Sequence, residues 1–174
     1  APSGTEEMNR AVIQKIIGML RSYPEHESVF LRLNEFITET KEYFDFHKGR
    51  PLHPKFEDFV QFEMQYACET FLNSSCFRNL QKSSRKRQRA QLLQVLESYI
   101  MEGIHDVVFN WIAKEEEAHD LELTKILGGM SSWTQHDLGM RIEFQCPQDE
   151  AVMEFSKLTA AKTPLEKMLR LNGT

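Results

Sequence analysis

With 174 residues, the chain is long enough for one domain or two small ones. Hydrophobic residues make up 41% of it, which excludes a disordered chain. The net charge of −5 and the pI of about 5.7 give no electrostatic basis for binding nucleic acid. We therefore expect a globular protein with no nucleic-acid partner.

The sequence contains no segment typical of a membrane or secreted protein. No apolar run approaches the roughly 20 residues that a membrane-spanning helix needs. The first residues lack the basic and apolar regions of a signal peptide. Cys68, Cys76 and Cys146 have no metal-site spacing, so we expect free thiols in a reducing compartment. These features predict a cytoplasmic protein without a cofactor.

Apolar residues recur at steps of three and four in the first half of the chain, which predicts three amphipathic helices. Thr5 is expected to cap the first helix, and Pro24 to begin the second. A loop is expected at 47–54, and a break after the third helix at 73–76. The three apolar stripes are Met8, Val12, Ile16 and Leu20, widened by Ile13 and Ile17; Phe30, Leu33, Ile37, Thr40 and Phe44; and Phe56, Val60, Met64, Ala67 and Phe71.

The second half is also expected to be helical, because no proline lies between residues 54 and 147 and strand signals are weak. A long helix is predicted from near Arg87 to Ile112, with a mostly irregular segment later, at 133–147. In the last helix, Thr163 and Glu166 match a capping box around Pro164. Shorter helices are expected at 118–127, 149–158 and 163–171. The fold class predicted is all-α, with a helical bundle.

The long helix carries the most specific pattern in the chain. Its order of residue types resembles the first core helix of Vps-nine (vacuolar protein sorting nine) domains, which activate Rab GTPases of the early endosome. Three later segments, 121–127, 137–144 and 162–171, resemble further parts of such domains in the right order. At Glu102-Gly103 the family usually has Thr followed by Arg or Lys. The matching residues of the long helix are Glu97, Tyr99, Ile100, Met101, Ile104, Val108 and Phe109.

The resemblance implies an N-terminal helical bundle at 1–90 and the first half of a Vps-nine-like core at 91–174. It implies part of a guanine-nucleotide exchange factor that acts on an early-endosomal Rab GTPase in endocytic vesicle traffic, in the cytoplasm and peripheral to endosomal membranes. In the family, the active Asp and its helper Tyr lie on helices after the Pro-x-x-Lys-Leu stretch, which Pro164 begins here. The sequence reaches Thr174 before those helices, so no catalytic residue is assigned, and whether the chain is an enzyme by itself is left open.

A basic segment is the clearest charge feature. Residues 70–96 contain no acid and six bases. One interpretation is a contact with an anionic membrane surface or an acidic partner, made by Lys82, Arg85, Lys86, Arg87 and Arg89. The alternative, which we favour, is an exposed linker with Ser83 and Ser84 at its centre.

Two Glu-x-x-His pairs are candidate metal ligands, because a carboxylate and an imidazole three residues apart share a helix face. The pairs are Glu102 with His105 and Glu116 with His119. In di-iron bundles such pairs lie on different helices and point inward, whereas Glu102 and His105 are expected to point away from the apolar stripe. We therefore predict no metal site at either pair.

Two further functions remain open beside the exchange factor. The first alternative is a non-catalytic adaptor or interaction module in vesicle trafficking, whose Vps-nine-like half lacks the exchange machinery. The second and weaker alternative is a four-helix metalloprotein built on the Glu-x-x-His pairs.

Overall fold

The computed structural model describes residues 10–47, 53–78, 82–145 and 149–172, and within these ranges the protein is all-α and contains no strand. The predicted cap at Thr5 lies outside the described residues. In chain order the elements are α1 (Arg10–Arg21), the 3-10 helix η1 (Pro24–His26), α2 (Glu27–Phe46), α3 (Phe56–Asn73), α4 (Lys82–Glu115), α5 (Glu117–Gly129), η2 (Ile142–Phe144), α6 (Asp149–Ser156), η3 (Lys157–Ala160) and α7 (Pro164–Asn172).

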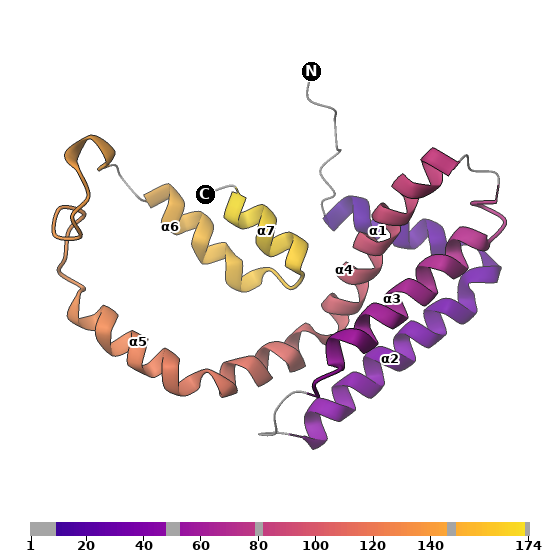
Figure 1. The fold of residues 1–174 in the computed structure, drawn as a ribbon, viewed down its shortest axis with the longest axis horizontal. Helices are drawn as coiled ribbons and strands as arrows, with labels where there is room; N and C mark the ends of the chain where they lie inside the picture. The colour runs from indigo at the N-terminus through magenta and orange to yellow at the C-terminus, as the bar shows by residue number, and fades with distance from the viewer. Residues whose placement is uncertain (1–9, 48–52, 79–81, 146–148, 173–174) are drawn as a thin grey trace.

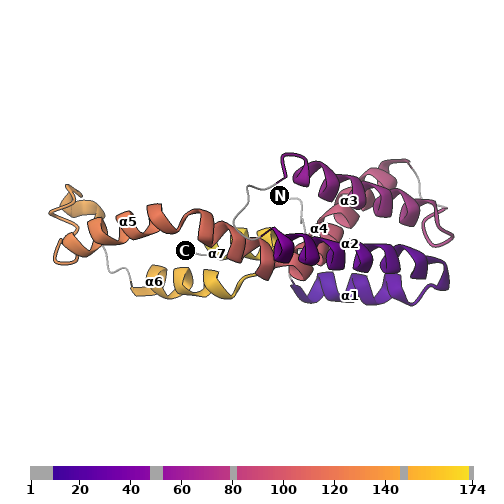
Figure 2. The same cartoon turned by 90° about the horizontal axis from the view of Figure 1, so that it is seen from below.

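The molecule has two parts, a four-helix bundle and an arm of shorter helices. Figure 1 shows α1, α2, α3 and the first part of α4 packed together, with α5 extending away from them and α6 and α7 running back toward α4. Figure 2 shows the same division after a turn of 90°, with the bundle and the arm at opposite ends of an elongated molecule. In the described ranges, no helix combines the length and the apolar character that crossing a membrane requires.

The core of the bundle is made by the predicted stripes. In α1 the stripe centres on Ile13, Ile17 and Leu20, while Val12 and Ile16 lie at its edge. The stripe of α3 is buried at its C-terminal end around Phe71, and Phe56 at its start is only partly buried. The largest fully buried side chains are Phe71, Leu20, Leu33, Leu72, Leu96, Ile100, Ile104, His26, Val95 and Cys68.

The α4 helix is longer than predicted, with 34 residues instead of the span from Arg87 to Ile112. The linker interpretation of Ser83 and Ser84 is wrong, because both residues are helical. No proline or glycine lies between Lys82 and Arg87, so helix formation propagates back to Lys82. The expected division after residue 90 falls inside α4, and Leu92 and Leu96 belong to the bundle core. The domain boundary itself stays a prediction.

The arm packs much less tightly than the bundle. None of the residues of α5 is buried. The α7 helix returns to the bundle, where Leu165 packs against the core cluster. Its predicted capping box is confirmed: the Thr163 N–H donates to Glu166 Oε2 at 3.2 Å, and the Glu166 N–H donates to Thr163 Oγ1 at 3.2 Å. The capping box fixes the start of α7 beside α4.

Candidate functional site

The joint between the bundle and the arm lies in the middle of α4. Ile100 and Ile104 are both fully buried there. Gly103 lies against α2 so closely that a Cβ at this position would be 2.8 Å from Ile37 Cδ1 and 3.0 Å from Ile37 Cγ2. Gly103 therefore allows α2 and α4 to approach each other at the joint.

A polar cluster ties three helices together at this joint. Glu102 of α4 accepts hydrogen bonds from Arg10 Nη2 at 2.6 Å and from Gln14 Nε2 at 3.2 Å, both on α1. Arg10 Nε also lies 3.7 Å from Glu166 Oε1 of α7. Glu102 does point away from the apolar stripe, but it contacts α1, which the sequence did not predict.

A second set of contacts holds α7 against α4 farther along. Lys162 Nζ lies 3.3 Å from Asp106 Oδ1, and Lys167 Nζ lies 4.9 Å from the centre of the Phe109 ring. A hydrogen bond from His105 and the charge of Lys162 lower the pKa of Asp106. The face of α4 that follows Gly103 is therefore the surface to which α7 attaches.

The two Glu-x-x-His pairs are placed apart from each other. His105 Nδ1 lies 3.0 Å from Asp106 Oδ1, and its ring stacks on Phe109 with the centroids 5.3 Å apart, while Glu102 faces α1. His119 Nδ1 lies 3.1 Å from Glu116 Oε2, and both side chains are exposed. Among the described residues, neither pair belongs to a cluster of three or more metal-ligand side chains.

The basic segment forms the first turns of α4. Arg85 Nη2 donates to Asn73 Oδ1 at 2.7 Å, and Arg89 Nε donates to Glu69 Oε1 at 3.0 Å, so both arginines turn toward α3. Lys86 and Arg87 are exposed, and the side chain of Lys82 lies outside the described residues. No acid lies in the first turn of α4, where the helix dipole disfavours positive charge. An anionic surface would relieve this repulsion.

We expect binding to anionic vesicles to depend steeply on salt if Lys86 and Arg87 meet a membrane. The Debye length shrinks from about 30 Å at 0.01 M salt to about 8 Å at 0.15 M, which screens such a contact. Cosedimentation at both ionic strengths measures this, with Lys86→Glu/Arg87→Glu expected to abolish the binding. The matched control is Lys41→Glu/Lys125→Glu, a reversal of two exposed charges elsewhere. Binding that is the same at both ionic strengths contradicts the membrane contact. An equal loss of binding in the two double variants also contradicts it.

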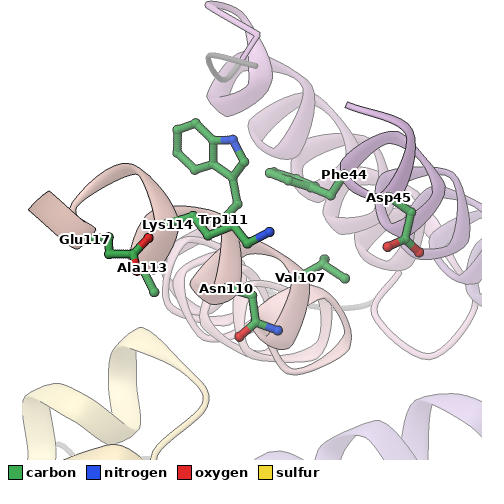
Figure 3. A pocket seen from close by; sticks show the side chains of 8 residues that line it. All are labelled: Phe44, Asp45, Val107, Asn110, Trp111, Ala113, Lys114 and Glu117. Atoms are coloured by element: carbon green, nitrogen blue, oxygen red, sulfur yellow. The ribbon is translucent and has the colours of Figure 1, made fainter. Parts of the chain in front are cut away.

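A hollow of about 570 Å³ opens where α4 leaves the bundle (Figure 3). Figure 3 shows the rings of Phe44 and Trp111 approaching each other from α2 and α4. Their centroids are 6.2 Å apart in an edge arrangement. The sequence indicated no hollow, because Phe44 falls on an apolar stripe and is expected in the core. The remaining lining residues are Asp45, Val107, Asn110, Ala113, Lys114 and Glu117.

The arm exposes an extensive apolar surface. Isolated exposed apolar residues are ordinary, but a contiguous group marks an interaction surface. On α5 the side chains are more than half exposed, with Leu121 at 57% and Ile126 at 55%. On α6, Val152, Met153 and Phe155 are similarly exposed. Further helices or a partner protein could therefore cover this apolar surface of the arm.

No family model matches the chain, and no solved structure matches it. The sequence pattern of α4 and α7 and the arrangement of the helices are thus the basis for assigning a function.

Proposed function

We propose that the chain is part of a guanine-nucleotide exchange factor for an early-endosomal Rab GTPase, in which the bundle braces a Vps-nine-like core. The observation that carries this proposal is the continuity of α4. Its first half supplies Leu96 and Ile100 to the bundle core, and its second half leads into the arm. One rigid helix thus belongs to both parts, and the residues that resemble the family's first core helix lie at the joint.

The exposed apolar surface of the arm supports the same proposal. A helix whose apolar residues are exposed, such as α5, gains stability when another helix covers them, at about 25 cal/mol per Å² of apolar area. In a Vps-nine-like core, the remaining helices would pack on α5 and α6. The capping box and the Lys162–Asp106 contact hold α7 at the point from which those helices would continue.

The mechanism implied by the resemblance involves no bond formation. An acidic side chain of the complete core enters the phosphate and Mg²⁺ site of the GTPase and weakens GDP binding, so the nucleotide-free state is stabilised relative to the bound one. In this scheme, the role of residues 1–174 is to hold the core helices in position. The basic start of α4 would face the anionic endosomal membrane.

The second candidate is a non-catalytic adaptor in vesicle traffic. The hollow beside Phe44 and Trp111 favours it, because an aromatic-walled hollow can receive a side chain of a partner protein directly. This function needs no further core helices. The weaker metalloprotein candidate is not supported by the Glu-x-x-His pairs, because Glu102 and His105 contact different neighbours.

We expect the chain alone to leave GDP release from an early-endosomal Rab unaccelerated, because no residue matches the active Asp or its helper Tyr. The measurement follows the release of a fluorescent GDP analogue at micromolar chain concentration. The positive control is a chimera in which residues 10–172 are followed by the remaining core helices of an active Vps-nine protein. This chimera is expected to accelerate GDP release. Acceleration by the chain alone contradicts the assignment of the active residues, and an inactive folded chimera favours the adaptor.

A further inference from the structure

Three metal-ligand side chains meet at the end of the bundle farthest from the arm. Glu25 and His26 belong to the connection between α1 and α2, and Cys76 lies in the turn after α3. Figure 1 shows these two connections at the same end of the bundle. One carboxylate oxygen, one imidazole nitrogen and the sulfur all lie within 4.8 Å of one another. Cys76 follows Glu25 and His26 by about fifty residues, so no spacing motif in the sequence predicts the cluster.

The ring of His26 is fixed in an orientation that suits metal binding. His26 is fully buried, and its Nδ1 lies 2.8 Å from the Leu20 carbonyl oxygen. A carbonyl oxygen only accepts, so Nδ1 carries the proton and Nε2 keeps a free lone pair in the neutral ring. Phe71 holds the ring edge-on, with the centroids 4.8 Å apart. The hydrogen bond from Nδ1 to a backbone carbonyl is one that metal-bound histidines commonly make.

The Nε2 lone pair of His26 faces the Cys76 thiol, with which it makes a long hydrogen bond. Nε2 lies 3.9 Å from Cys76 Sγ. A zinc ion with ordinary tetrahedral Zn–S and Zn–N bonds would place these two atoms about 3.5 Å apart. A shift of a few tenths of an ångström therefore brings both atoms to ligand distance. Cys76 is only partly buried, so an ion can reach it from solvent.

The carboxylate of Glu25 is already held in place. The Ser75 N–H and Oγ both donate to Glu25 Oε1, at 3.0 Å and 2.6 Å. The bonds from Ser75 use Oε1, so Oε2 remains available as a ligand. The other described cysteine, Cys68, differs: burial raises the pKa of its thiol to about 11.

We propose that Glu25, His26 and Cys76 form a zinc site. The donors are one thiolate, one imidazole and one carboxylate, a set that suits Zn²⁺, and water would complete a tetrahedron. The ion would tie the α1–α2 connection to the turn that leads into α4. It would therefore stabilise the bundle at the end opposite the joint, independently of the proposed exchange function.

Titration of the purified chain with Zn²⁺ alone tests the site. We expect one equivalent to bind, and the thermal unfolding midpoint to rise with zinc concentration. Cys76→Ser should weaken binding at least about tenfold, since it removes the thiolate ligand, whereas Cys146→Ser, the matched control, should leave it unchanged. With Co²⁺ as a probe, a sulfur-to-cobalt charge-transfer band should appear, and Cys76→Ser should abolish it. Glu25→Gln should weaken binding less, because an amide oxygen is a poorer ligand.

The buried His26 is not replaced in this test, because its loss would disturb the core. Cys76 is partly exposed and Glu25 is exposed. Far-ultraviolet circular dichroism of their variants serves to check that they fold. Absence of zinc uptake by the wild-type chain overturns the site. Unchanged affinity in folded Cys76→Ser also overturns it, and so does an equal loss in Cys146→Ser.

Discussion

Replacement of Ile104 by alanine is expected to lower the free energy of unfolding by about 2–5 kcal/mol. Ile104 is fully buried, with 0% of its surface accessible to solvent. It belongs to the core cluster of the bundle, and Leu165 of α7 packs against the same cluster. Truncation removes apolar contacts and leaves a cavity at the joint. Chemical denaturation monitored by circular dichroism measures the loss.

The control for Ile104 is Glu102→Ala, two residues earlier on the polar side of α4. From the sequence alone, the expected cost is under about 0.5 kcal/mol, as for most surface changes. The contact with Arg10 raises this to at most about 1 kcal/mol, because exposed ion pairs contribute little. Equal losses for the two variants, or a larger loss for Glu102→Ala, would mean that the buried and polar faces of α4 are wrongly assigned.

Gly103→Ala is expected to destabilise the protein, although alanine is a better helix former than glycine by about 1 kcal/mol. The new Cβ would lie 2.8 Å from Ile37 Cδ1 and 3.0 Å from Ile37 Cγ2. Ile37 is branched at Cβ, so Cγ2 cannot move without rotation of the whole side chain. Overpacking of this kind costs about 1–3 kcal/mol, which exceeds the gain in helix propensity.

The matched control is Gly18→Ala, the same substitution inside α1. A Cβ at Gly18 meets nothing within 4 Å, so this variant should gain about 0.5–1 kcal/mol from helix propensity alone. Since the propensity gain is common to both variants, the difference between their denaturation midpoints isolates the contact with Ile37. A stabilised Gly103→Ala would show that α2 and α4 are farther apart than the structure places them.

The helices and their buried faces could be predicted from the sequence, because apolar spacing depends only on residues near one another in the chain. The capping box of Thr163 and Glu166 is the clearest example, since both partners lie within one turn. The start of α4 was missed because Ser83 and Ser84 are typical of loops. Their helical state follows from the absence of a helix breaker and from the packing of the rest of α4.

Contacts between helices could not be predicted from local spacing. The pattern places Glu102 on the polar side of α4, but only the folded bundle brings Arg10 of α1 to that side. The same holds for His26 and Cys76, which two different connections bring together. The reason for a glycine at position 103 is likewise visible only in the close approach of Ile37.

The proposed Vps-nine-like core is tested most directly by GDP release from an early-endosomal Rab with the chimera of residues 10–172 and the remaining helices of an active Vps-nine core. We expect acceleration of more than about tenfold, which corresponds to about 1.4 kcal/mol of barrier. Replacement of the active Asp of the added helices by alanine should abolish it. The matched control joins the same helices to residues 10–115, without the arm, and should be inactive. A folded chimera that leaves the intrinsic rate unchanged would contradict the proposal that α5–α7 are the first half of a Vps-nine-like core.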